Sequence, residues 1–540
     1  MGPVENSKPS RDFSANTIQE FSAPRHWQSF AFVRHAARID FGDGSVIRDC
    51  HLEQLQHVPE LEFRQCDLIE SPHALANCRV LRFISCDGLT DVGGLSDVQD
   101  LTVTGSRHVL NLDKLGNLRV LATGSSFASP IPSVSSCLTA PARSTPWSSF
   151  NFLDELHLKQ CHELPESIDF QVASVSLSSC ESLESIACFN RAAQLELVRT
   201  RALTPEPFQG FSLLQSIRIQ ASTCLVDLSD LANVHHVSLS LCVNLQDIAP
   251  LASANTVELS CCPQLQSVAP LQYVPNVTLS RCADLTDVSS LTHNTVVRLS
   301  ECYRVTQVSA LAAHCHTVDI ARCYRITDAA ALAAAGSMHT VALDGCNVAQ
   351  EDARAWLNHP TLHTIDLSNN LDIHDASPFA HLHTVFLDRT SIRDVTPLRD
   401  VHTLSLSSCD LLQDVSALGN VHTLDLSYCM NIRDVSALGT VHTLNLAGTL
   451  VEDVAALAMV YELNLSGCPQ LTDDQVNSLQ FNHTLLLMGC AQLTRVDGLR
   501  FIHTLNLANC IGITDVSMLG HVHALDLTGC LNVQDRPLQN

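Results

Sequence analysis

Cysteine is the residue type in this chain with the widest reactivity, and most of its 23 cysteines recur at one position of a repeated segment. The recurring set includes Cys66, Cys161, Cys242, Cys282, Cys302, Cys323, Cys409, Cys429, Cys490, Cys510 and Cys530. Asn370, Thr390 and Thr449 replace cysteine in the same frame, and all three can hydrogen-bond to backbone where a strand ends. The pattern therefore predicts a structural ladder of buried thiols, without zinc or disulfides, as a reducing compartment permits.

Histidine forms a second periodic set, one residue after a leading aliphatic and usually before threonine. Its members are His316, His339, His363, His383, His402, His422, His442, His483, His503 and His523, with Tyr461 in the same slot once. The slot precedes a strand at a bend, so we expect the rings to turn outward and stack on one another. Stacked imidazoles about 5 Å apart resist simultaneous protonation, because neighbouring positive charges repel each other. A surface that responds to pH is therefore the alternative interpretation. Metal binding has less support because no carboxylate lies nearby in the repeat.

Aspartate forms a third set, placed just before a V-S-A-L-like segment. Its members are Asp247, Asp287, Asp328, Asp375, Asp394, Asp414, Asp434, Asp453, Asp473, Asp515 and Asp535. A carboxylate in this place can cap the following turn by accepting backbone N–H bonds. Calcium is the alternative ligand, but one carboxylate per repeat falls short of the six or more oxygens that calcium needs.

The three sets share a period of about 20 residues, which indicates a repeat architecture. Residues 401–419, VHTLSLSSCDLLQDVSALG, align with residues 421–439, VHTLDLSYCMNIRDVSALG. In the L-x-L element a strand would bury Leu424 and Leu426 while Asp425 faces out. Because one unit cannot bury this face alone, about two dozen stacked units must complete one continuous core with parallel strands.

The first half of the unit matches the leucine-rich-repeat pattern L-x-x-L-x-L-x-x-[N/C]-x-L. Its D-V-S-A-L segments, at residues 414–418 and 434–438, resemble the short repeats of bacterial internalins. Its C-x-x-I-T-D run, at residues 510–515, resembles the cysteine-containing repeats of F-box-type leucine-rich proteins, and similar repeats occur in protist and giant-virus families. The resemblance covers roughly residues 40–540. It implies an α/β-type repeat solenoid, an arc with a parallel β-sheet on the concave face and turns or short 3₁₀ segments on the convex face. For function it implies protein–protein recognition.

The regular units occupy only part of the chain. We expect a disordered tail over 1–25, an N-terminal cap over 26–45, repeats over 46–123, a Ser/Pro-rich insertion over 124–150 and repeats over 151–540. The last unit is as regular as the others and no polar capping segment follows it. Its edge strand would therefore be exposed, or covered by another subunit or by a part missing from this chain, and oligomers could form there.

Composition limits the partners. A formal net charge of −25 and a pI near 5.3 disfavour nucleic acid and favour a neutral or basic protein. No stretch approaches the roughly 20 apolar residues that a membrane span needs, and the N-terminus has no apolar signal-peptide core. We expect a soluble, unanchored cytoplasmic protein.

Catalytic motifs are missing from the sequence: it has no G-x-S-x-G, no phosphate-binding glycine loop and no H-E-x-x-H. We therefore expect a non-enzymatic scaffold without cofactor or metal that binds a protein on its concave face. Tyrosine and arginine dominate binding hot spots, and the candidate contact residues are Arg298, Tyr303, Arg304, Tyr324, Arg325, Phe386 and Arg389.

Two alternatives stay open. Residues 10–45 could form an F-box-like segment, which would make the protein a ubiquitin-ligase substrate adaptor. The near-identical units could also belong to a structural or surface repeat protein without one specific ligand.

Overall fold

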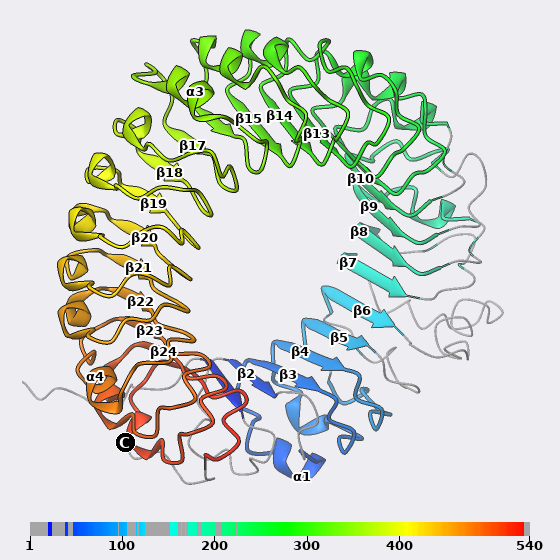
Figure 1. Ribbon diagram of the computed structural model, residues 1–540. Helices are drawn as coiled ribbons and strands as arrows, with labels where there is room; N and C mark the ends of the chain where they lie inside the picture. The colour runs from blue at the N-terminus through cyan, green and yellow to red at the C-terminus, as the bar shows by residue number, and fades with distance from the viewer. Residues whose placement is uncertain are drawn as a thin grey trace, which may run out of the picture.

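The computed structural model describes residues 20–23, 38–41, 47–95, 97–104, 115, 118–124, 152–159, 164, 168, 171–180, 183, 185–200, 208–222, 225 and 227–533. The predicted insertion, apart from Gly124, and residues 1–19 of the predicted tail lie outside this part of the chain. Within it, one sheet of 25 strands lines the inside of a ring, and short helices and turns form the outside (Figure 1).

Each strand pairs in parallel with the strand of the next coil, in register, so that equivalent residues stand side by side. The strands are β1 Glu20–Ala23, β2 Arg38–Phe41, β3 Glu60–Arg64, β4 Val80–Ile84, β5 Asp100–Thr104, β6 Val120–Gly124, β7 Phe152–Lys159, β8 Gln171–Ser178, β9 Gln194–Val198, β10 Ser216–Gln220, β11 His236–Ser240, β12 Thr256–Ser260, β13 Asn276–Ser280, β14 Val296–Ser300, β15 Thr317–Ala321, β16 Thr340–Ala342, β17 Thr364–Asp366, β18 Thr384–Phe386, β19 Thr403–Ser405, β20 Thr423–Asp425, β21 Thr443–Asn445, β22 Glu462–Asn464, β23 Thr484–Leu486, β24 Thr504–Asn506 and β25 Ala524–Asp526.

The convex side carries short helices, mostly of the 3₁₀ type, as a unit of this length allows. The α-helices are α1 Asp49–Leu52, α3 Gln350–Ala353 and α4 Asp473–Asn477. The 3₁₀ helices are η1 His73–Leu75, η4 Ala187–Phe189, η5 Ser229–Leu231, η6 Ala249–Ser253, η7 Ala269–Leu271, η8 Ser309–Ala313, η9 Ala329–Ala334, η10 Arg354–Trp356, η11 Ser377–Phe379, η12 Thr396–Leu398, η13 Ser416–Asn420, η14 Ser436–Leu438, η15 Ala455–Met459, η16 Asp497–Phe501 and η17 Ser517–Leu519. The predicted solenoid is confirmed.

The core runs continuously between the strands and the convex helices. In the coil that contains β20, Leu424, Leu426, Ile432 and Leu438 are all at most 1% exposed, whereas Asp425 is half-buried on the inner face. These are the inward and outward positions that period two predicts for the strand. Towards the N-terminus Phe41, Phe63 and Phe83 take one of the inward positions, and their rings stack with centroids 5.0 and 5.3 Å apart.

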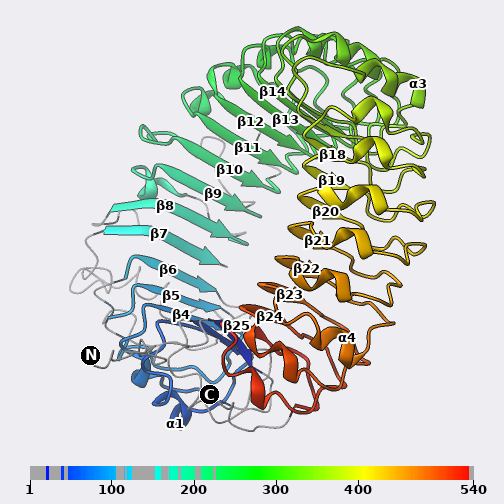
Figure 2. The same ribbon diagram turned by 90° about the vertical axis from the view of Figure 1, so that its left-hand side faces the viewer.

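The two ends of the sheet meet. Strand β1 pairs in parallel with β2 on one side and with β25 on the other, so the strands close into a ring (Figures 1 and 2). Both expectations for the ends were wrong at this point. Residues Glu20–Ala23 form a strand where a disordered tail was expected, and the edge of β25 is covered by the same chain, not by another subunit or a missing part. Strand β2 lies within the range expected to be a cap.

A left-handed residue follows most of the described strands, one position before the thiol ladder, where the chain turns towards the outside of the ring. This residue is Arg389 after β18 (φ 53°), Tyr428 after β20 (φ 59°) and Gly448 after β21 (φ 68°). At Gly448 a Cβ atom would lie 2.6 Å from the ring of Tyr428, in addition to adopting an unfavourable φ.

We predict that Gly448→Ala lowers the free energy of unfolding by about 1 kcal/mol, the cost of placing a side chain in left-handed backbone. The midpoint of urea unfolding, followed by circular dichroism, measures the change. Gly336→Ala is the matched control, because nothing lies within 4 Å of the added Cβ. Equal midpoints for the two variants would contradict the explanation.

Candidate protein-binding surface

The predicted thiol ladder is buried among the described residues; Cys161 lies outside them. Cys409, Cys429 and Cys510 are all 0% exposed, and the Sγ of Cys429 donates to the carbonyl oxygen of Leu406 on the preceding coil at 3.0 Å. Thr390 and Thr449 are also buried and donate to the backbone carbonyls of Leu387 and Leu446 at 2.7 and 2.6 Å. The structural interpretation of the ladder is therefore confirmed.

The predicted aspartate caps also form. Asp394, Asp414, Asp434 and Asp515 each accept the backbone N–H two residues further on, at 2.8–2.9 Å. For Asp414, hydrogen bonds from Ser416 lower the pKa of the carboxyl. Asp328 differs, because it accepts the N–H groups of Val308 and Ser309 on the preceding coil; Asp535 lies outside the described residues.

Apart from His316, for which no ring contact is seen, the predicted histidines stack outward along the edge of the sheet where the strands begin. We call His339, His363, His383, His402, His422, His442, Tyr461, His483, His503 and His523 the imidazole column. Neighbouring ring centroids are 4.3–4.9 Å apart and nearly parallel. In most of them the Nδ1 atom lies 3.1–3.4 Å from the hydroxyl of the following threonine. Parallel rings do not point two nitrogen lone pairs at one ion, so the column is a poor metal site.

The turns that follow the strands form the opposite edge of the sheet, which we call the carboxyl-edge rim. Tyr303, Arg304, Tyr324 and Arg325 lie on this rim after β14 and β15, and Arg389 lies on it after β18. The other two predicted contact residues do not join them. Arg298 is on β14 and Phe386 is on β18, both at outward positions that face the inside of the ring.

Tyr303 and Tyr324 lie with parallel rings, their centroids 6.0 Å apart, and both are about half exposed. Arg281 and Arg304, which lie beside them, form ion pairs. Glu301 accepts hydrogen bonds from Arg281 at 3.0 and 3.1 Å and from the hydroxyl of Tyr303 at 2.8 Å, and these bonds lower the pKa of its carboxyl. Arg304 pairs with Asp284 at 3.1 Å. This cluster is aromatic and polar, and two of its arginines are ion-paired.

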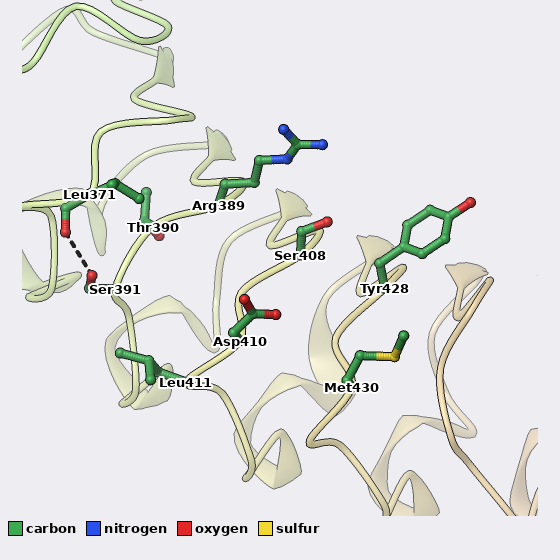
Figure 3. Close-up of a pocket in the computed structure, with 9 residues that line it drawn as sticks. All are labelled: Leu371, Arg389, Thr390, Ser391, Ser408, Asp410, Leu411, Tyr428 and Met430. Carbon is green, nitrogen blue, oxygen red and sulfur yellow. Dashed lines mark hydrogen bonds between the residues drawn. The ribbon is translucent and has the colours of Figure 1, made fainter.

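A pocket of about 700 Å³ opens on the same rim, in the coils of β17 to β20 (Figure 3). It is lined by Leu371, Arg389, Thr390, Ser391, Ser408, Asp410, Leu411, Tyr428 and Met430. Figure 3 shows Arg389, Ser408 and Tyr428 in one row, and Asp410, Leu411 and Met430 in a second row below it. Leu371 is 74% exposed, Tyr428 57% and Met430 46%, which is unusual for large apolar side chains.

Of the pocket residues, sequence reasoning identified only Arg389. The signal that could have identified the others is the position of the apolar residues within the repeat. Leu371 and Met430 stand one residue after the ladder, where Ser391 and Asp410 show that the repeat accepts polar residues. Folding does not require an apolar residue at an exposed position that is polar in neighbouring units. Such a residue therefore indicates a candidate binding surface.

The inner face of the sheet is acidic near the pocket. Burial raises the pKa of the carboxyls of Asp319, Asp366 and Asp388, and for Asp366 the nearby Asp344 and Asp388 raise it further. Carboxylates this close repel anions.

Among the residues that the structure describes, no three His, Cys, Asp or Glu side chains are placed to hold a metal ion. No helix in the same part of the chain is long and apolar enough to cross a membrane.

Comparisons with solved structures show the kind of fold. No known family's sequence profile and no curated protein sequence matches the chain. Among solved structures, the TLR13–ssRNA13 complex matches with a TM-score of 0.56 and 14% identity, covering 95% of this chain and 85% of that one. An internalin of Listeria monocytogenes (17% identity, TM-score 0.32, 53% and 84% coverage) and mouse RP105 with MD-1 (13%, 0.41, 87% and 86%) are more distant in shape. The chain is a leucine-rich-repeat protein by fold.

We predict that the ladder thiols stay unreactive in the native protein. They are buried, and burial raises the pKa of Cys429 and of Cys510 to about 12, so almost no thiolate exists at pH 8. A disulfide-forming dye, with the labelled sites located by mass spectrometry, should modify exposed Cys50 first and ladder thiols only after denaturation. Cys50→Ser is the control. Fast native labelling of most ladder positions is the opposing result.

We also predict that acid destabilises the imidazole column. Burial and the neighbouring histidines lower the pKa of His363 and of His402 below 6.5. The unfolded chain therefore takes up protons more readily, and stability, complete above pH 6.5, falls as the pH drops through the lower folded values. Melting temperatures at pH 5 and pH 7.5 measure this.

The variant His402→Tyr, which copies the slot of Tyr461, should lose less stability on acidification than the parent chain. His57→Tyr is the control, because His57 is exposed and lies outside the column. If both variants show the parent's pH dependence, the column does not cause it.

Proposed function

We propose that this protein is a non-enzymatic recognition scaffold that binds a protein partner on its carboxyl-edge rim, with the pocket of Leu371, Leu411, Tyr428 and Met430 as the anchor. The observation that carries this proposal is the gathering of exposed apolar side chains around one pocket of about 700 Å³. Folding does not need these side chains at the surface, since equivalent coils fold with polar residues there. An exposed apolar patch around a concavity is typical of a binding site.

The chemistry of the pocket favours a polypeptide segment with an apolar side chain as its anchor. Arg389 and Asp410 stand at the pocket as one cation and one anion, which can bind the polar backbone or side chains beside that anchor. The acidic inner face and the net charge of −25 favour basic over acidic residues in the rest of the partner. This proposal moves the site from the concave face, where the sequence analysis put it, to the adjoining rim.

The alternatives receive less support. TLR13 was solved with a single-stranded RNA, but a fold shared at 14% identity does not transfer that ligand, and the acidic inner face here disfavours phosphate. An F-box-like adaptor needs helices in residues 10–45, and the described parts of that range, β1 and β2, are strands. A repeat protein without one specific ligand would lack a selective pocket.

We predict that peptides selected from a random display library on the full chain contain an apolar or aromatic anchor with a lysine or arginine beside it. Leu371→Asp with Met430→Asp should weaken their binding about thirtyfold, as expected when a hot-spot contact of about 2 kcal/mol is lost. Isothermal titration calorimetry measures the affinity.

Met459→Asp is the matched control, because Met459 is 75% exposed but lies at the end of η15, away from the pocket. If the selected peptides bind the double variant as tightly as they bind the parent chain, the pocket is not their binding site. Failure to select any peptide would favour a repeat protein without a specific ligand.

A further inference from the structure

The place where the ring closes differs from every other junction in the described sheet. All other neighbouring strands are consecutive in the chain, so a coil of the same polypeptide connects them. Strands β1 and β25 are far apart in the sequence, and three register pairs join them: Glu20 with Ala524, Phe21 with Leu525 and Ser22 with Asp526. The two strands can therefore separate without moving a coil that connects them.

A proline follows strand β1 in the sequence, which limits backbone pairing at that end. This residue, Pro24, has no backbone N–H to donate to a ladder. A coil of the chain joins β1 to β2 but not to β25, and a strand connected to only one neighbour is easier to displace than one connected to both. If β1 leaves, β25 and β2 both present unpaired N–H and C=O groups.

The space between β25 and β2 then fits one extended strand. Two interstrand spacings of about 4.8 Å separate the two edges, which is room for a single strand in parallel register. The register also defines the side chains that such a strand needs. The position of Phe21 lies beside Leu525 and Ile39, and the position of Ala23 lies beside Phe41; all three neighbours are at most 2% exposed. Apolar residues are therefore required at alternate positions.

The position between those two faces the inside of the ring and is surrounded by charge. Ser22 is in register with Asp526 on β25 and with Asp40 on β2. Beyond Asp40 lies Glu62, which forms ion pairs with Arg38 and Arg64. A nitrogen of Arg64 also lies 3.4 Å from the Oδ2 of Asp40.

Two carboxylates thus flank the middle position. The Oδ1 of Asp40 is buried without a hydrogen-bond partner, and burial, together with Glu62, raises the pKa of this carboxyl. The Oδ1 of Asp526 accepts the backbone N–H of Thr528 at 2.9 Å, and its Oδ2 accepts a bond from the Nδ2 of Asn506 at 3.1 Å. A basic or hydroxyl side chain at the middle position suits these neighbours, and an acidic one does not.

We propose that the gap between β25 and β2 is a peptide-binding site of the strand-addition type, and that β1 is its built-in, displaceable occupant. The external ligand is an extended polypeptide segment with apolar residues at two alternate positions and a serine or basic residue between them. Main-chain pairing supplies the affinity, and the alternating side chains supply the specificity. This site is separate from the pocket on the carboxyl-edge rim and does not rest on the function proposed above.

The test uses the full chain and a fluorescent peptide of residues 17–26, followed by fluorescence anisotropy. In Phe21→Asp the built-in strand should be displaced, because its register position lies against buried apolar neighbours, and the peptide should bind one to one. The parent chain should bind it at least about tenfold more weakly, since β1 competes within the molecule. In Glu20→Cys with Ala524→Cys, joined by a disulfide between register partners, binding should disappear.

Specificity provides the second readout. Replacing serine by lysine at the middle position of the peptide should tighten binding to Phe21→Asp, and replacing it by aspartate should weaken it, each by about threefold to tenfold. Leu371→Asp with Met430→Asp should leave this binding unchanged, which separates the two sites.

The proposal is overturned if Phe21→Asp, with an unchanged circular dichroism spectrum, binds the peptide no better than the parent, or if the disulfide-joined chain binds as well as Phe21→Asp. Should Phe21→Asp fail to fold, Phe21→Ala, which only removes the ring, takes its place with the same expected order of affinities. Equal binding of the lysine and aspartate peptides would contradict the assigned register.

Discussion

A coil of about 20 residues cannot cover its own apolar side chains, and the architecture follows from this constraint. In each coil the two inward strand residues, the ladder residue and the aliphatics of the return segment all point to one interior, as Leu424, Leu426, Cys429 and Leu438 do. Only the next coil can shield that interior from water, and the parallel backbone pairing fixes the distance between coils at about 4.8 Å. Burial and strand pairing therefore select the same stacking.

The outside of each coil needs more room than the inside, which bends the stack. Helical turns are about 10 Å wide, whereas paired strands are about 4.8 Å apart, so each coil acts as a wedge with its strand at the narrow end. Sharing 360° among the 25 strands gives about 14° per coil, and 25 spacings of about 4.8 Å give an inner circumference of about 120 Å. At this curvature the first and last strands meet, and β1 covers the edge that β25 would otherwise expose.

The repeated polar residues stabilise the coil, and the two binding sites that we propose lie at exceptions to the repeat. Thiols, capping aspartates and stacked imidazoles each satisfy a need that returns in every coil, so their recurrence carries no catalytic meaning. The pocket residues Leu371 and Met430 satisfy no such recurring need, and strand β1 pairs with β25 where no coil of the chain connects the two strands. Both proposed binding sites lie where the chain departs from its own pattern.

The sequence by itself determined the repeat, its parallel strands, its 3₁₀ turns and the roles of the three ladders, because each depends on residues within one coil or between adjacent coils. The exchange of Cys for Thr390 and Thr449 was sufficient to predict backbone hydrogen bonding at the ladder. Only the tertiary structure brought Tyr428 and Met430 together with Leu371, and only it placed Glu20–Ala23 beside β25. The pocket depends on how side chains from four coils lie relative to one another on the carboxyl-edge rim. Closure depends on a small angle per coil added up around the whole ring, and no local pattern of residues encodes that sum.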